Sequence, residues 1–408
     1  MKGFDRLIWI LFCVYVFMLP FENITKVMWQ IESPYRPYRI LALLIGLLIV
    51  ISRKPQGLKF YKNDLNLVWV YLFGLIPSMI AWSKGMLLAE SFWLTSIQYF
   101  IVLWIFLLIK SLPFTIRNIY QCMDLFCFGV VINSIYMLYL FGFEDMGRQS
   151  GWMDNPNFAA FACNVAFTYF FYQFYHTPAS GIKKFSWLVA VFILFAGLLV
   201  TGSRSALISF ALSMILIILF QFNWKQTMAK TGLVVISLLL LSLIIDFNRL
   251  ADAIPAWNRL VTLSGKEEAR STLWLKGLEA FKDSDFIGLG IEQFKNPKNY
   301  SRFVGQTENV SVANQAGLVL HNDYLTVLVE YGILAFVCFV GFYIGIKKGL
   351  NQIYLSNQNL FVFKVCFWNM AVFSMFASSF QSHALWFVYI ILTFVFYISI
   401  NKSKEFIV

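Results

Sequence analysis

The chain has 408 residues, of which 59% are apolar, 19% aromatic and only 13% charged, and its formal net charge is +11 at pH 7. This composition excludes a water-soluble globule, because too few polar side chains are available to cover its surface. It also argues against a nucleic-acid-binding protein, since the basic residues occur in pairs between apolar stretches instead of in one patch. We therefore expect a single polytopic domain over residues 1–408, surrounded by membrane lipid.

Apolar stretches long enough to cross a bilayer follow one another along most of the chain. Because a helix needs about 20 apolar residues to span the hydrocarbon, the sequence predicts an all-α integral membrane protein with about twelve transmembrane helices. The expected spans are 7–20, 38–52, 66–82, 92–109, 118–141, 156–175, 185–201, 206–222, 231–246, 319–345, 361–379 and 382–400. No small-residue cleavage site follows the first stretch, so we interpret it as a retained span and not as a signal peptide.

Lysine and arginine in the short connections predict which side of the membrane each connection occupies. If the N-terminus is cytoplasmic, the cytoplasmic connections collect most of the basic residues, including the pairs Arg53-Lys54, Lys183-Lys184 and Lys347-Lys348. Both termini are then cytoplasmic, and one long hydrophilic segment, about 247–318, lies outside. Its nearly balanced charges and its Trp, Leu and Phe content indicate a folded, partly helical cap and not a disordered tail.

Arginines that lie outside are not explained by this charge bias, and two of them occur in short connections. Arg204 follows Thr201-Gly-Ser, where small neighbours leave its guanidinium open to an anion. A snorkelling arginine at the interface is the alternative interpretation. Arg148 lies in the loop 147–157, which is rich in turn residues, and a purely structural role fits it equally well.

A third outside arginine, Arg270, lies within an expected helix. Ser264-Gly-Lys-Glu267 has the form of a capping box, and the helix is expected to run to about Lys282. At ~100° per residue, one face of this helix carries Arg270, Trp274, Gly277 and Phe281. An arginine on this apolar face either has a buried carboxylate partner or binds the negative charge of a ligand.

Of the three histidines, His321 is the candidate for chemistry because it opens the span that follows the cap. An imidazole at the lip of a water-accessible cavity can act as a general base, although a capping or hydrogen-bonding role also fits this position. Glu330 falls on roughly the opposite helical face, so it is an intramembrane carboxylate and not an evident relay partner of His321. His176 and His383, at the ends of other spans, are expected to be interfacial or packing residues.

One acidic pair raises the question of a metal. Asp283-Ser-Asp285 has the Asp-x-Asp form that some sugar transferases use, but its position between a helix and Gly288-Leu-Gly290 favours a C-terminal turn. The six cysteines all lie in apolar stretches, where they are expected to pack in the core. We expect neither a metal nor another cofactor.

Several of these patterns, in this order, resemble the O-antigen ligase and polymerase superfamily of bacterial membrane glycosyltransferases. The pieces that carry the resemblance are the loop 148–157, Thr201-Gly-Ser-Arg-Ser-Ala206, Arg270 with Trp274, Gly288-Leu-Gly290 followed by Phe294, and His321-Asn322 followed by Glu330-Tyr-Gly332. The long outside segment between the ninth and tenth expected spans adds to it. The resemblance covers roughly residues 145–340.

The resemblance implies a glycosyltransferase of the bacterial inner membrane with its active site on the periplasmic face. The donor would be a glycan on undecaprenyl diphosphate, and the acceptor a lipid-linked glycan or lipid A-core, in the assembly of O-antigen or another surface polysaccharide. Arg204 and Arg270 would hold the diphosphate, with Arg148 as a weaker addition, and His321 would activate the acceptor hydroxyl. Trp274, Asn322 and Glu330 would contact substrate. Two arginines can stabilise the departing diphosphate without a metal cation, so we expect metal-independent transfer with inversion.

Two enzymatic functions fit this resemblance. A polymerase joins lipid-linked repeat units, with a chain-length regulator as a possible partner, whereas a ligase transfers the glycan to lipid A-core. Many ligases carry a second histidine just before the His-Asn pair, and here that neighbour is Leu320, so we favour the polymerase. A flippase for lipid-linked oligosaccharide, or another transporter, is a more distant alternative, because the sequence lacks paired halves with broken helices.

Overall fold

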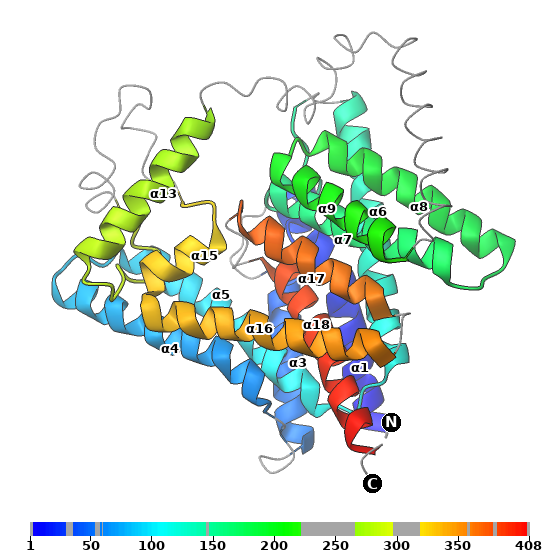
Figure 1. Cartoon of the computed structure of the whole chain (residues 1–408), viewed down its shortest axis with the longest axis horizontal. Coiled ribbons are helices and arrows are strands. Elements are labelled where there is room, and N and C mark those ends of the chain that lie inside the picture. The colour runs from blue at the N-terminus through cyan, green and yellow to red at the C-terminus, as the bar shows by residue number, and fades with distance from the viewer. Residues whose placement is uncertain are drawn as a thin grey trace.

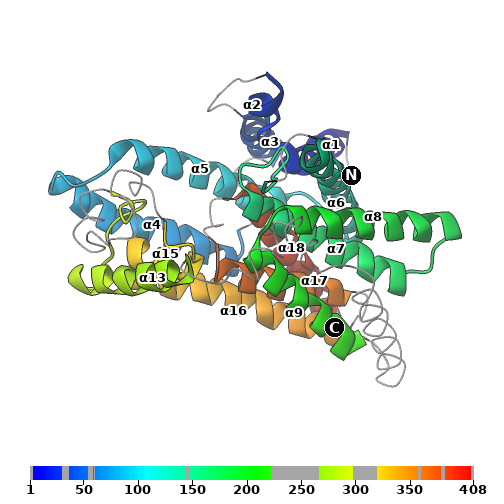
Figure 2. The same cartoon turned by 90° about the horizontal axis from the view of Figure 1, so that it is seen from above.

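A computed structural model describes residues 3–29, 36–53, 58, 60–143, 147–221, 266–296, 319–356, 360–377 and 382–405. Every regular element among these residues is a helix. The helices are α1 (Gly3–Met18), α2 (Ile24–Trp29), α3 (Pro37–Arg53), α4 (Lys62–Ser83), α5 (Ala89–Leu108), α6 (Ile116–Phe143), α7 (Pro156–His176), α8 (Gly181–Val200), α9 (Arg204–Gln221), α13 (Lys266–Asp283), α15 (Asp323–Thr326), α16 (Ile333–Ser356), α17 (Phe361–Ser374) and α18 (His383–Glu405). Figures 1 and 2 show their arrangement.

Six of the described helical stretches are long and apolar enough to cross a membrane: Gly3–Phe21, Lys62–Ser83, Ala89–Ser111, Ile116–Phe143, Gly181–Val200 and Ile333–Asn351. Shorter apolar helices occupy Arg204–Ile217, Phe361–Ser374 and His383–Ile398. The all-helical membrane fold is therefore confirmed. The total of about twelve spans stays a prediction, because the expected span 231–246 lies outside the described residues.

The centre of the bundle is formed by helices that are buried on all sides. Every residue from 382 to 395, at the start of α18, is buried, and so is every residue from 159 to 170 in α7. These helices are surrounded by the rest of the protein, whereas a membrane-spanning helix at the periphery can face lipid. The peripheral helices instead expose large apolar side chains, such as Trp82 and Phe192, to their surroundings. Such a surface suits lipid and not water.

Connections that we expected outside contact one another at one end of the bundle. The backbone N–H of Asn23 donates to the carbonyl oxygen of Trp152 at 2.7 Å. The backbone N–H of Leu88 donates to Oε1 of Gln293 at 2.8 Å, which joins the connection between α4 and α5 to the segment after α13. We call this end, at the upper left of Figure 1 where α13 and α15 lie, the cap end.

Connections that we expected inside contact one another at the opposite end, which we call the base end. Nη2 of Arg53 lies 2.8 Å from Oδ1 of Asp5, and the ring of Tyr61 stacks on that of Tyr397 at a centroid distance of 3.7 Å. In Figure 1 the start of α1 and the end of α18 lie at this end, at the lower right. The two groups of connections support the alternation that we expected, while the side of the membrane that each end faces stays a prediction.

The expected span 319–345 is not one continuous helix. Its first part is α15 and a π-helical turn, Val327–Tyr331, and α16 begins only after Gly332, whose φ is +91°. The segment 286–290 runs directly against this break. Leu289 and Gly290 donate their N–H groups to the carbonyl oxygens of Val329 and Glu330, both at 2.9 Å.

Glycine is required on both sides of this contact. A Cβ on Gly332 would lie 1.9 Å from the carbonyl oxygen of Ile287, and one on Gly288 would lie 2.8 Å from the backbone nitrogen of Gly332. Two glycines that the sequence placed in separate motifs are thus neighbours in space. The difference from the expected helix arises because backbone hydrogen bonds to another segment replace helical ones, which a hydropathy pattern does not record.

Replacing Gly332 by alanine should strongly destabilise the protein. The variant combines a left-handed backbone with a clash against a carbonyl oxygen, so we expect a loss of about 3 kcal/mol or more. The measurement is the midpoint of thermal unfolding of the purified protein in detergent. Gly85→Ala is the matched control, since Gly85 also has positive φ, +66°, but nothing lies within 4 Å of its added Cβ. Equal losses in the two variants would contradict the close backbone contact.

Candidate active site

The loop 147–155 and the turn before α9 form one unit at the cap end. Nε of Arg148 donates to the carbonyl oxygen of Thr201 at 2.9 Å, and the N–H of Gln149 donates to the carbonyl oxygen of Val200 at 3.1 Å. Nη2 of Arg148 also donates to Oδ1 of Asn157 at 3.0 Å. Arg148 is exposed and thus supports the turn that leads to Arg204.

The turn itself follows from its small residues. Gly202 has φ of +62°, which ends α8, and the hydroxyl of Thr201 donates to the carbonyl oxygen of Leu198 at 2.7 Å. The carbonyl of Ser203 accepts the first hydrogen bond of α9, so Arg204 is the first residue of that helix. Arg204 is half-buried at the cap end, where the sequence predicted it.

A second group forms where α13 lies on the segment that carries His321. Nε1 of Trp274 donates to the carbonyl oxygen of Leu320 at 2.8 Å, and the side chain of Leu320 packs against Gly277. Phe281 is buried on the same side of α13. The predicted apolar face is therefore confirmed, and both figures show α13 beside α15.

Arg270 lies one helical turn before Trp274 on this face. Its backbone belongs to α13, while its side chain lies outside the described residues. Ser264 and Gly265 of the predicted capping box also lie outside them, and α13 begins at Lys266. The turn expected at Asp283-Ser-Asp285 is confirmed, with the N–H of Asp285 donating to the carbonyl oxygen of Lys282 at 3.0 Å.

His321 occupies a strained position directly before α15. Its φ is +50°, a left-handed conformation that costs free energy for a residue other than glycine and is often found at functional sites. The next residue, Asn322, is the N-cap of α15, where its Oδ1 accepts the N–H of Leu325 at 3.0 Å. The cap explains why a short polar side chain follows the histidine.

Glu330 is buried in the π-helical turn and faces the segment after α13. Its two carboxylate oxygens accept the N–H groups of Glu292 and Phe294, at 3.0 and 3.1 Å. These bonds give Glu330 a structural role, and a contact with substrate stays a prediction.

The end of α17 lies between the two groups. On one side, the hydroxyl of Tyr324 donates to the carbonyl oxygen of Ala371 at 3.1 Å, and the rings of Trp274 and Phe376 lie 6.5 Å apart. On the other side, Nδ2 of Asn164 in α7 donates both to Oδ1 of Asn369 in α17, at 3.0 Å, and to the carbonyl oxygen of Ala206 in α9, at 3.3 Å. The structure thus brings all the sequence-predicted segments to the same end of the bundle.

Residues 189–340 match the family model described as O-antigen ligase. The match confirms the resemblance to the O-antigen ligase and polymerase superfamily and supports a glycosyltransferase of that type. No curated protein matches the chain.

The matched residues include the turn before α9, the whole of α13 and the His321 segment, whereas Arg148 precedes them. Sequence reasoning missed a further set of polar residues that contact the Arg148 loop from the N-terminal helices, among them Arg36 and Glu22. No local motif marks these two residues. The only signal in the sequence was that Arg36 lies in a connection expected outside, where basic residues are few.

Replacing Glu330 by glutamine should weaken the contact between the segment after α13 and the π-helical turn. The glutamine oxygen can accept only one of the two backbone N–H groups, and the NH₂ group would face the other donor. We expect the free energy of unfolding to fall by about 1–3 kcal/mol. Thermal unfolding in detergent measures it. Glu279→Gln, on the exposed face of α13, is the control and should change little. An unchanged midpoint for Glu330→Gln would contradict the assigned role.

Proposed function

We propose that the protein transfers a glycan from undecaprenyl diphosphate to an acceptor sugar at the cap end, which faces the periplasm. The observation that carries the proposal is the position of α13, the helix of Arg270, on the His321 segment within the part of the chain that matches O-antigen ligase. The strained backbone of His321 and the location of Arg204 at the same end of the bundle support it.

The chemistry assigns one task to each group. The acceptor hydroxyl attacks the anomeric carbon, its proton passes to the imidazole of His321, and the bond from that carbon to the diphosphate oxygen breaks. Negative charge then accumulates on undecaprenyl diphosphate, where the guanidinium groups of Arg204 and Arg270 stabilise it. Attack opposite the leaving group inverts the anomeric configuration. Since arginine supplies the positive charge, transfer should persist in the presence of a metal chelator.

The proposed roles predict the activity of three variants. Arg204→Ala, Arg270→Ala and His321→Ala should each reduce transfer by about 100-fold or more, because each removes charge stabilisation or general-base catalysis. The measurement is glycosidic bond formation by purified protein in liposomes that contain the lipid-linked donor and acceptor. Expression and the unfolding midpoint of each variant are recorded in parallel.

Two variants at the base end serve as matched controls. Arg117→Ala removes an exposed arginine and His176→Ala a histidine at the end of α7, and both should keep the wild-type rate. Wild-type rates in the Arg204 and Arg270 variants would contradict the proposed site. Movement of labelled donor across the liposome membrane by wild-type protein, without bond formation, would instead indicate a flippase.

Between the two enzymatic functions, we favour the polymerase, whereas the description of the matched family favours the ligase. The basis for the polymerase is Leu320 at the position before the His-Asn pair, where it is buried between α13 and the π-helical turn. A deletion strain separates the two. If the protein is a polymerase, gel analysis of its surface polysaccharide should show core capped with a single repeat unit, while core with no repeat would indicate a ligase.

A further inference from the structure

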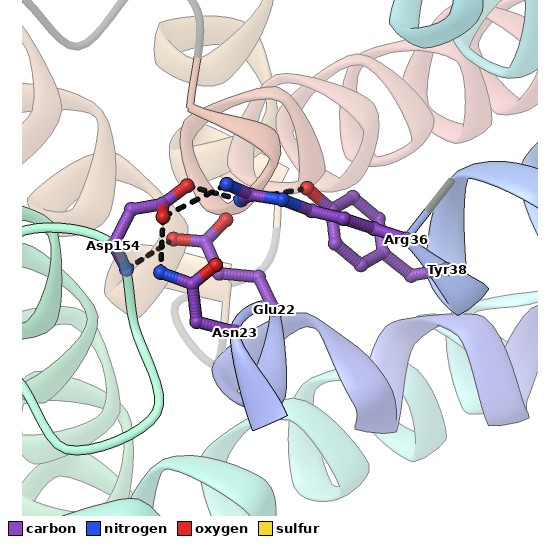
Figure 3. Close-up of polar contacts among 5 residues, drawn as sticks. All are labelled: Glu22, Asn23, Arg36, Tyr38 and Asp154. Carbon is purple, nitrogen blue, oxygen red and sulfur yellow. Dashed lines mark hydrogen bonds and ion pairs between the residues drawn. The ribbon is translucent and has the colours of Figure 1, made fainter. Parts of the chain in front are cut away.

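A set of charged and polar side chains joins the N-terminal helices to the Arg148 loop, and Figure 3 shows it. Both guanidinium Nη atoms of Arg36 bind the two carboxylate oxygens of Asp154, Nη2 at 2.9 Å from Oδ1. Nδ2 of Asn23 donates to the same Oδ1. Oε1 of Glu22 accepts the backbone N–H of Asp154 at 3.0 Å. We call Glu22, Asn23, Arg36 and Asp154 the clasp.

The clasp engages Asp154 through both its side chain and its backbone. A fork-to-fork pair of arginine and carboxylate fixes orientation as well as distance. The bond from Asn23 N–H to the carbonyl oxygen of Trp152 adds a second point of attachment two residues away. Because Arg36 and Asp154 neutralise each other, this arrangement is suited to holding the loop and not to binding an anion.

The opposite side of the loop is held by α6. Oδ1 of Asn133 accepts the N–H of Trp152 at 2.8 Å, and its Nδ2 donates to the carbonyl oxygen of Ser150 at 3.2 Å. Gly151, with φ of +59°, lies so close to Asn133 that an added Cβ would be 2.3 Å from Oδ1. The loop is therefore fixed between α6 and the clasp, and its conformation depends on both.

The loop is hydrogen-bonded in turn to the segment that carries Arg204. Arg148 and Gln149 bind the carbonyl oxygens of Thr201 and Val200, which end α8 immediately before α9. A path of direct contacts thus runs from Arg36 through Asp154 and the loop to the turn before Arg204. Catalysis is sensitive to such positioning, since a displacement of about 1 Å in a binding group can cost up to 100-fold in rate.

We propose that the clasp is a positioning element of the donor site, which holds the Arg148 loop and the turn before Arg204 where the diphosphate of the lipid-linked glycan binds. The inference rests on the proposed function. Arg36 and Asp154 act through Arg148 and Arg204 and do not touch the donor. Loss of the clasp should therefore weaken donor binding more than it slows the transfer step.

The test compares steady-state transfer by purified wild-type protein, Arg36→Gln, Asp154→Asn and the exchanged pair Arg36→Asp with Asp154→Arg. Each neutralised variant should raise KM for the lipid-linked donor by about tenfold, with a smaller change in kcat. The conservative variant Arg36→Lys, which keeps the charge but not the fork, should lie between wild type and Arg36→Gln. The exchanged pair should recover part of the lost affinity.

The control is the ion pair between Arg53 and Asp5 at the base end. It joins α3 to α1, its side chains are 25% and 14% exposed, and those of Arg36 and Asp154 are 20% and 35% exposed. Arg53→Gln should lower the unfolding midpoint by an amount similar to that of Arg36→Gln and leave the donor KM unchanged. An equal rise of KM in both variants would overturn the proposal, since it would reflect general destabilisation.

Hydrogen–deuterium exchange of residues 148–155 gives a readout that does not depend on activity. Exchange should become faster in Arg36→Gln and stay unchanged in Arg53→Gln. Faster exchange with an unchanged donor KM would overturn the positioning role, as would unchanged exchange and unchanged KM. If wild-type protein forms no glycosidic bond at all, the proposed function fails; if wild type is active and the clasp variants keep its KM, only the present inference fails.

Discussion

The close contact between two glycine-containing backbones is the constraint on which the arrangement of the cap end depends. Residues 286–290 run against the break at Val327–Gly332, with hydrogen bonds from Leu289 and Gly290 to the carbonyl oxygens of the π-helical turn. A longer side chain at Gly332 would separate the two segments. The contact fixes where α13 ends and where α16 begins, and therefore sets the position of Trp274 relative to Leu320 and His321. A mechanism that requires Arg270 near His321 depends on this backbone packing.

Charged side chains occupy both the interior and the surface of the bundle. At the base end, Lys110 and Asp64 form a fully buried ion pair at 2.6 Å, with the hydroxyl of Tyr397 donating to the same carboxylate. Such a pair needs all its hydrogen bonds because burial removes water from both charges. At the cap end, Arg148 is exposed and Arg204 half-buried, on short turns that other loops support. The buried pair stabilises the interior of the bundle, whereas the two arginines lie closer to the surface, where Arg148 also supports the turn before Arg204.

Local patterns predicted the helices and part of the site, and contacts between distant segments account for what they missed. The face of α13 with Trp274 and Gly277 follows from helical periodicity, and the start of α9 at Arg204 follows from the small residues before it. The break at Gly332 could not be predicted in this way, because its cause is hydrogen bonding to residues 40 or more positions earlier in the chain. The pair of Arg36 and Asp154 is separated by 118 positions and has no local signature. A hydropathy pattern predicts which helix faces are apolar, but it does not predict which polar groups form hydrogen bonds with one another.

The all-round burial of residues 382–395 has a consequence for how the protein is made. Ribosomes deliver membrane helices in sequence order, so α1 to α9 enter the bilayer before the helix that fills their centre has been synthesised. Until then, the faces that will pack on α18 must be covered by lipid or by one another. Helices such as α6, α7 and α8 can already pack on one another, whereas the faces of α5 and α6 that contact α18 are completed only when that helix is inserted.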